Sequence, residues 1–237
     1  MKTPYIICLV LAMAMVIPSA GQKIKVHAAG ALKNYMINGD ISAKANLDTL
    51  AHKPNLFALG AVENLKGEIL IINSQPYISH AANGTIRIDQ SFQYKASLLV
   101  YSRIKSWREV KFPVGSISYQ HLEKFIGDQI ASLKLEQDGV FPFRLSGVAT
   151  SVDWHVIDWP EGDQVHTHEK HKKEGLNGRL EQQKIEVVGF YSTRHKGVFT
   201  HHTTNMHLHM INDDQTIVGH VDDLILNKQM KLFLPVN

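Results

Sequence analysis

Short runs of apolar and β-branched residues, each bounded by turn-forming residues, follow one another along most of this chain. Val, Ile and aromatic side chains favour the extended backbone, whereas Gly, Pro, Asn and Ser favour the turns between strands. The pattern predicts strands at ten segments: Asn55–Leu59, Glu68–Asn73, Thr85–Asp89, Ala96–Ile104, Val140–Leu145, Val148–Ile157, Glu186–Tyr191, Met206–Ile211, Thr216–Val221 and Met230–Leu234. Such a chain has to bury its apolar surface mainly in β-sheets.

Two segments show helical spacing instead. Leu32 and Met36 are four residues apart and precede Gly39, which predicts a short helix with a glycine end. A longer helix is predicted between Ser118, a suitable amino-terminal cap, and Leu135. Its apolar residues recur at helical intervals: Leu122, Phe125, Ile126, Ile130 and Leu133. We therefore predict a mixed, β-rich α/β fold of two β-sheet domains with a long helix between them.

The first residues have the three zones of a secretory signal peptide. Lys2 is followed by the apolar run Tyr5–Ile17 and then by the small-residue segment Pro18–Gly21. The run is too short for a convincing membrane span, so we predict a signal peptide in residues 1–21, cleaved before Gln22. An uncleaved anchor or a buried helix is the alternative. The mature protein is then exported, to the periplasm or the extracellular space, without stable membrane association.

The predicted elements divide the mature chain in two. The amino-terminal mixed β-sheet domain covers residues 22–115, and the helix with the carboxy-terminal β-sheet domain covers residues 116–237. In the second domain, Pro160–Gln183 is polar and lacks a sustained apolar period, which predicts a long loop with one helical turn. Its His166–His171 segment is expected at the surface, with a pocket lid or a second metal site as the alternatives.

The composition excludes some classes of binding partner and of site chemistry and favours others. Lys and Arg total 25 and Asp and Glu total 22, and the two signs are interspersed, so no basic tract is present to bind a nucleic acid. The single cysteine, Cys8, lies in the predicted signal peptide, which excludes thiol chemistry in the mature protein. Most of the 14 histidines lie between His155 and His220, which favours a metal or proton-transfer site.

One predicted strand and the turn after it carry a candidate metal site. His207 and His209 are two residues apart in Met206–Ile211, so both imidazoles leave the same face of the strand. Asn212–Gln215 supplies turn residues, and the returning strand brings His220 alongside. Three imidazoles facing one point suit a divalent ion, zinc first, and leave positions open for water or substrate. The alternative is that these histidines are solvated polar residues on exposed strands.

The same residues belong to a longer pattern. Val188–Thr193 is followed by Met206–Ile211, and ten residues separate His209 from His220. This pattern resembles the metal-binding core of the alpha-acetolactate decarboxylase family. Three upstream segments resemble the opening helix of the family, its glutamate-bearing turn and the strand that leads to its active-site arginine: Gly30–Leu32, Gly60–Ile69 and Phe143–Gly147.

The resemblance implies a specific chemistry. His207, His209 and His220 match the three zinc ligands of the family, and Glu68 matches its active-site glutamate beside the metal. Members have a two-domain α/β fold, are often homodimers, and convert 2-acetolactate (2-hydroxy-2-methyl-3-oxobutanoate) to acetoin and carbon dioxide. The implied function is that of a carbon–carbon lyase in acetoin biosynthesis, with zinc or another divalent ion as cofactor and a small 2-hydroxy-3-oxo acid as substrate.

The sequence also departs from the family pattern. His155 stands where the family has its active-site arginine, and an imidazole offers one donor at a time near pH 7 where a guanidinium is a permanent cation. We expect His155 to be catalytic as a proton donor, or to be a fourth metal ligand. Ala61 replaces a threonine, and the sequence ends at Asn237, before the position of a family tail glutamate, which is expected to lack a counterpart. The alternative function is a catalytically impaired, exported homologue that binds a metal or a small ligand.

Overall fold

The computed structural model describes residues 24–112, 115–132 and 139–236. The predicted signal peptide, and the end of the predicted long helix at residues 133–135, lie outside these described residues. None of the described helices is long and apolar enough to cross a membrane.

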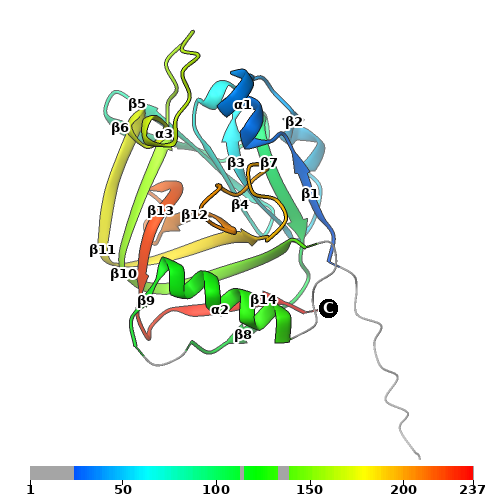
Figure 1. Ribbon diagram of the computed structural model, residues 1–237, viewed down its shortest axis with the longest axis vertical. Coiled ribbons are helices and arrows are strands. Elements are labelled where there is room, and N and C mark those ends of the chain that lie inside the picture. The colour runs from blue at the N-terminus through cyan, green and yellow to red at the C-terminus, as the bar shows by residue number, and fades with distance from the viewer. Residues whose placement is uncertain (1–23, 113–114, 133–138, 237) are drawn as a thin grey trace, which may run out of the picture.

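The first sheet is built from the amino-terminal half of the chain (Figure 1). Within the described residues it has seven strands, in the order β1-β7-β3-β4-β5-β6 with β2 paired to β7. All its pairings are antiparallel. The strands are β1 Val26–Ala29, β2 Ala45–Asn46, β3 Leu56–Val62, β4 Glu68–Ile72, β5 Gln75–Ala82, β6 Thr85–Asp89 and β7 Lys95–Arg103. Helix α1 (Leu32–Asn38) and the 3-10 turns η1 (Leu47–Leu50) and η2 (Glu63–Leu65) connect them.

The second sheet closes on itself. In the described part of the chain its seven strands follow the order β8-β14-β10-β11-β12-β13-β9, and β10 pairs with β13 as well as with β11. Strands β10 to β13 therefore form a closed ring that has no free edge between them. The strands are β8 Trp107–Val110, β9 Ile117–Ser118, β10 Phe141–Ile157, β11 Gly175–Tyr191, β12 Met206–Asn212, β13 Val218–Leu226 and β14 Lys231–Pro235.

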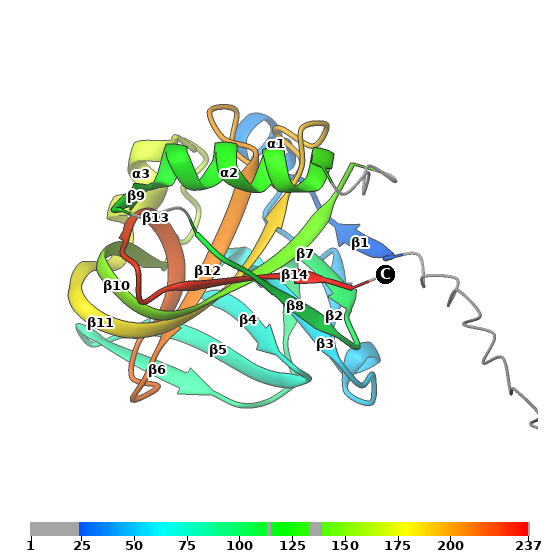
Figure 2. The same ribbon diagram turned by 90° about the horizontal axis from the view of Figure 1, so that it is seen from below.

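The long helix directly follows β9 in the chain and packs on the second sheet. Helix α2 (Tyr119–Ser132) buries Leu122, Ile126 and Ile130 in the apolar core of that sheet, and Figure 2 shows it along one side of the molecule. The predicted β-rich fold with two sheets and one long helix is thus confirmed. The domain boundary after residue 115 stays a prediction; β8, which precedes it, pairs with β14 of the second sheet.

A shared apolar core joins the two sheets. Phe57 and Val100 of the first sheet belong to the same buried cluster as Val188, Phe190 and Val218 of the second. Burying each large apolar side chain contributes about 1.5–3 kcal/mol to the free energy of unfolding. This shared core, which we call the seam, therefore stabilises the contact between the sheets.

Strand β12 presents its two faces to different cores. Leu208 and Met210 enter the core of the second sheet, whereas Ile211 enters the shared core. Because side chains alternate along a strand, His207 and His209 lie on the face of Ile211. The candidate metal ligands therefore face the seam between the two sheets.

The structure corrects the prediction for Pro160–Gln183. This segment contains the short helix α3 (His168–Lys173), and its last residues, 175–183, form the first half of β11. They pair in register with β10 from Gly175↔Ile157 onward. Their alternation of half-buried and exposed residues supplies no apolar run, so backbone pairing with a long neighbour, and not their own pattern, makes them a strand.

Strand β10 is continuous, although the sequence pattern predicts two strands on either side of Ser146 and Gly147. Gly147 adopts a φ of 141°, which other residues rarely reach, and stays within the strand. The backbone of Gln229 approaches Gly147 so closely that a Cβ atom there would lie 2.2 Å from the Gln229 carbonyl oxygen. The sequence pattern also misses β1, β2, β5, β8 and β9, which are short or carry weak apolar patterns.

Candidate metal centre

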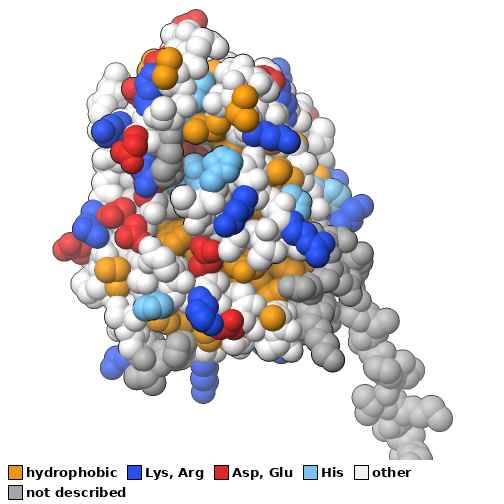
Figure 3. Space-filling model, viewed as in Figure 1, with side chains coloured by type: hydrophobic (Ala, Val, Ile, Leu, Met, Phe, Trp, Pro, Cys, Tyr) orange, Lys and Arg blue, Asp and Glu red, His pale blue; other side chains and the backbone are white. Residues whose placement is uncertain are grey.

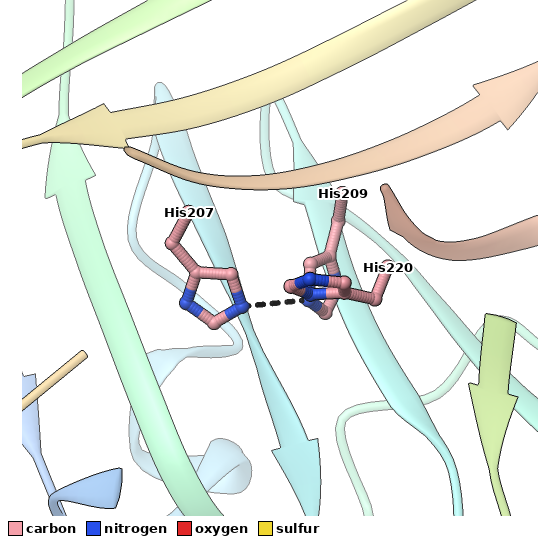
Figure 4. Close-up of side chains that lie close together, drawn as sticks. All are labelled: His207, His209 and His220. Carbon is pink, nitrogen blue, oxygen red and sulfur yellow. Dashed lines mark hydrogen bonds between the residues drawn. The ribbon is translucent and has the colours of Figure 1, made fainter. Parts of the chain in front are cut away.

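Three imidazoles meet where β12 and β13 run side by side. His209 and His220 are direct partners in the antiparallel register of these strands, and His207 lies two residues before His209. One ring nitrogen from each histidine lies within 4.8 Å of the other two. Nε2 of His207 and Nε2 of His209 are 3.1 Å apart, and Figure 4 shows the three rings converging. The spacing in the sequence thus corresponds to one cluster in space.

Burial keeps these rings neutral. His209 is fully buried and His207 is 7% exposed, so the interpretation as solvated residues is wrong for both. Burial, followed by repulsion from His201, lowers the pKa of His207 to about 3. Burial also lowers the pKa of His209 and of His220 well below the usual value. A neutral imidazole is the form that binds a metal.

The donor set fits a divalent ion. Three imidazole nitrogens are the ligands of catalytic zinc sites that keep a fourth position open. Nε2 of His207 and Nε2 of His209 lie 3.1 Å apart, close to the spacing of two nitrogens that bind one ion at about 2.0–2.1 Å in tetrahedral geometry. The geometry therefore supports a divalent metal site.

A carboxylate from the first sheet lies beside the cluster. Glu68 begins β4, which is an interior strand, and the residue is only 4% exposed. Its Oε2 lies 3.7 Å from Nε2 of His209, and its Oε1 lies 3.8 Å from Nε2 of His155. The backbone N–H of Ile157 donates to Oε1 at 3.3 Å. Burial raises the pKa of Glu68 to about 7, although the charge of His155 opposes the shift.

His155 is held against this carboxylate by a second one. It lies on β10 opposite His220 of β13, and its Nδ1 is 2.8 Å from Oδ2 of Asp222. Lys172 of α3 forms an ion pair with the other oxygen of Asp222 at 3.4 Å. Burial opposes ionisation of Asp222, but the hydrogen bond from His155 and the charges of His155 and Lys172 lower its pKa. Both nitrogens of His155 therefore face carboxylates.

Several of these side chains line one pocket in the seam. On the face in Figure 3, histidine side chains gather near the centre beside a hollow. The polar residues that line the pocket are Tyr35, Glu68, His155, His171, His201, His207 and His220. Ala61 lines it too, where the family resemblance led us to expect a threonine. None of the described residues that line it is an arginine or a lysine.

The expectation of a surface position for His166–His171 is wrong for its two ends. His166 and His171 are each 8% exposed, and Nδ1 of His166 lies 3.0 Å from Nε2 of His171. The ring of His166 stacks on Trp159, with centroids 4.2 Å apart. The local pattern carries no signal for this burial, because the rings are covered by residues such as Tyr35 that are distant in the chain. Tyr35 and Asp222 are polar residues of the site that the sequence pattern does not reveal, whereas His171 belongs to the segment for which a pocket lid was the alternative.

Comparison with known proteins agrees with this geometry. Residues 30–234 match the family model described as "Alpha-acetolactate decarboxylase". No curated protein matches the chain. Among solved structures, alpha-acetolactate decarboxylase from Bacillus subtilis strain 168 is 15% identical with a TM-score of 0.70, covering 90% of this chain and 85% of that one.

Two further structures have the same fold. Acetolactate decarboxylase from Bacillus subtilis subspecies spizizenii is 16% identical with a TM-score of 0.71, covering 90% of this chain and 86% of that chain. A Staphylococcus aureus protein of unknown function, described as similar to alpha-acetolactate decarboxylase, is 13% identical with a TM-score of 0.67, covering 90% and 85%. At these identities the likeness establishes the fold, and the match over residues 30–234 establishes the relationship. The chain belongs to the alpha-acetolactate decarboxylase family.

Proposed function

We propose that this protein is a metal-dependent carbon–carbon lyase that converts 2-acetolactate to acetoin and carbon dioxide. The observation that carries the proposal is the cluster of His207, His209 and His220, whose ligand nitrogens lie within 4.8 Å of one another. The buried carboxylate of Glu68 stands beside the cluster, 3.7 Å from His209. Membership of the family supports the same reaction.

We assign His207, His209 and His220 as the metal ligands and zinc as the first candidate, because three neutral imidazoles suit a borderline-soft ion. A bound divalent ion would supply Lewis acidity toward the ketone and hydroxyl oxygens of a 2-hydroxy-3-oxo acid. The pocket in the seam is where these histidines are accessible to a small molecule, since His207 and His220 line it.

Glu68 and His155 are assigned to proton handling. The reaction breaks the bond between the carboxylate and C2, releases carbon dioxide and adds one proton to the remaining four-carbon fragment. Glu68 Oε1 and His155 Nε2 lie 3.8 Å apart on the pocket wall, so either can hold the substrate hydroxyl or move the proton that completes acetoin. Oδ2 of Asp222 lies 2.8 Å from Nδ1 of His155 and holds the ring at the edge opposite to Glu68.

The test is acetoin formation from racemic acetolactate by the purified protein. We expect a rate above the spontaneous reaction, loss of that rate after treatment with a chelator, and its recovery when zinc is added. A His209→Ala variant controls for the site and should remain at the spontaneous rate. Metal bound stoichiometrically without acetoin formation would reject the lyase and favour a homologue that only binds the metal or a small ligand.

We further propose that the protein acts outside the cytoplasm, after removal of residues 1–21, and that it functions as a homodimer. The charged, apolar and small-residue zones of the first 21 residues support export. Sequencing the amino terminus of protein recovered from the cell exterior or periplasm, together with its mass in solution, tests both statements. A first residue other than Gln22, or a monomeric mass, would count against them.

A further inference from the structure

A pocket for a 2-hydroxy-3-oxo acid has to accept a carboxylate, and the role of that carboxylate rests on the proposed function. Arginine or lysine usually binds a carboxylate, but the described residues that line this pocket include neither. The candidate metal ligands direct their nitrogens to one point. His155 has Oδ2 of Asp222 2.8 Å from its Nδ1 and Oε1 of Glu68 3.8 Å from its Nε2. The carboxylate therefore needs a donor from another residue of the pocket wall.

Tyr35 carries such a donor. Its side chain lines the pocket, although the residue as a whole is only 4% exposed. No group of the described residues forms a hydrogen bond with its hydroxyl. Nor is this hydroxyl one of the fully enclosed polar atoms that lack a partner in the described part of the chain. It is therefore open to the pocket, and its proton is available to a ligand.

The hydroxyl stays protonated and neutral. Burial, and then the negative charge of Glu68, raise the pKa of Tyr35 well above its usual value. A phenol with a raised pKa keeps its proton near neutral pH. Tyr35 is therefore a hydrogen-bond donor and not the source of the proton that completes acetoin, a role that stays with Glu68 and His155.

The helix that carries Tyr35 is fixed at both ends. At the start of α1, the backbone N–H of Leu32 donates to the backbone oxygen of Val198 at 2.7 Å. At its end, Gly39 has the left-handed conformation, and its N–H donates to the backbone oxygen of Tyr35 at 3.1 Å. A helix with these anchors can hold a substrate-contacting side chain in a fixed position, as preorganised sites require.

Neighbouring side chains pack against the phenol ring. The ring of Tyr35 lies 5.6 Å from that of His171 and 6.2 Å from that of His166, measured between centroids. Leu32, which is three residues earlier and on the same face of α1, is buried with it in the apolar core that the two sheets share. The ring is therefore held in the seam, while its hydroxyl is accessible from the pocket.

We propose that Tyr35 is a substrate-contacting residue whose hydroxyl donates a hydrogen bond to the carboxylate of the 2-hydroxy-3-oxo acid. A neutral donor suits a carboxylate that has to leave. As the bond to C2 breaks and carbon dioxide forms, negative charge moves from the carboxylate to the remaining fragment. A cation held at the carboxylate would therefore stabilise the bound substrate more than the transition state. A phenol hydroxyl binds a carboxylate less strongly than the charged fork of a guanidinium and opposes this step less.

The experiment compares two ligands that differ only in the carboxylate. 2,3-Dihydroxy-2-methylbutanoate has no ketone and is not a substrate for this decarboxylation, and 2,3-butanediol is the same molecule without the carboxylate. Their affinities for the zinc-loaded protein are measured by calorimetry, directly or in competition. Tyr35→Phe keeps the ring and removes only the hydroxyl. We expect it to weaken binding of the acid about tenfold, as for one hydrogen bond to a charged group, and binding of the diol less than about twofold.

Two further variants separate binding from packing. Tyr101→Phe removes the hydroxyl of a half-buried tyrosine on β7 that does not line this pocket, and it should alter neither affinity. Tyr35→Leu removes the ring as well and should lower the thermal unfolding midpoint, because it leaves a cavity in the shared core. Tyr35→Phe breaks no hydrogen bond among the described residues, so its midpoint should stay within about 2 °C of that of the unsubstituted protein. Zinc content is measured for each variant.

Specific outcomes overturn the proposal. Equal weakening of the acid and the diol by Tyr35→Phe, or a midpoint as low as that of Tyr35→Leu, would mean that the tyrosine only supports the fold. Unchanged affinity of Tyr35→Phe for the acid, or a selective loss for His201→Phe in its place, would put the carboxylate elsewhere in the pocket. Neither ligand is turned over, so these outcomes are independent of acetoin formation, whose absence would instead reject the proposed function.

Discussion

The hydrogen bond of 2.8 Å between Nδ1 of His155 and Oδ2 of Asp222 decides which edge of the imidazole faces the pocket. With Nδ1 engaged, Nε2 is the atom directed to Glu68. Asp222→Asn keeps the shape and weakens this hydrogen bond. We expect acetoin formation to fall about tenfold, in line with a hydrogen bond to a charged group, while zinc content stays the same.

The adjacent residue offers a matched control for that variant. Asp223 is exposed, and its carboxylate accepts from the backbone N–H of Leu224. Asp223→Asn removes the same charge one residue away and should leave acetoin formation within about twofold. If the two variants behave alike, the effect is one of local charge, and Asp222 has no role in orienting His155.

Glu68 is expected to set the rate of the reaction without holding the metal. Glu68→Gln replaces a buried carboxylate by a group of the same shape that cannot take up a proton in the reaction. We expect kcat to fall by about a hundredfold or more, as for loss of a general acid–base group, with zinc still bound by the three histidines. Steady-state kinetics and metal analysis measure the two quantities. Full activity of this variant would remove Glu68 from the chemistry.

Residues of the site differ in how well the sequence predicts them. The two-residue period of a strand predicts that His207 and His209 lie on the same face. The turn that returns the chain predicts that His220 lies beside them. Asp222 is not predictable in this way, because spacing alone does not say whether it or Asp223 faces inward. Their positions depend on the bulge in the pairing of β13 with β10, which only the folded chain reveals.

One carboxylate joins helix α2 to the strand that carries two of the candidate metal ligands. Glu123 of α2 accepts from Thr204 Oγ1 at 2.6 Å and from Asn205 Nδ2 at 2.7 Å. These two residues come directly before β12, which begins at Met206 and carries His207. The contact therefore fixes the start of the ligand strand relative to the long helix.

We predict that Glu123→Ala lowers the free energy of unfolding by about 2 kcal/mol, since it removes two hydrogen bonds to a charged group in a half-buried position. Zinc affinity should fall as well, because the start of β12 loses its anchor. Denaturant unfolding and zinc titration measure these effects. Lys124→Ala, which breaks only an exposed ion pair with Asp128, should change stability by less than about 0.5 kcal/mol; equal losses would contradict the anchoring role.

Elements with a clear apolar period are the predictable ones. Helix α1 ends at Gly39, which has the left-handed conformation that its position after the helix predicts. The first half of β11 has the pattern of a loop, because an exposed strand held by backbone hydrogen bonds to β10 has no apolar run to reveal it. The sequence pattern indicates which side chains are buried. It indicates that a segment pairs as a strand only where the paired residues are also buried.

The site as a whole takes residues from both sheets. The three candidate ligands belong to β12 and β13, whereas Glu68 belongs to β4 and Tyr35 to the helix that follows β1. A β-rich fold with two sheets and one long helix could be predicted from the order of the strands and the helix along the chain. The closure of β10 onto β13 and the packing of the sheets could not, because both join segments far apart in the chain.

Metal binding should raise the stability of the whole protein. A ligand that binds only the folded protein stabilises it by about 4 kcal/mol at a thousandfold excess over its dissociation constant. For a chain of this length that raises the unfolding midpoint by about 10 °C. We expect this shift on adding zinc to the chelated protein and its absence in His209→Ala, whereas His121→Ala, at an exposed position on α2, should keep it.

The shape of that transition tests how the sheets depend on each other. Phe57 and Val100 of the first sheet pack in one cluster with Val188 and Phe190 of the second, so neither sheet can unfold without exposing apolar surface of the other. We therefore expect a single calorimetric transition that zinc moves as a whole, although the candidate ligands all belong to the second sheet. Two transitions, of which zinc moves only one, would mean that the sheets are separate folding units and that the pocket between them forms by docking.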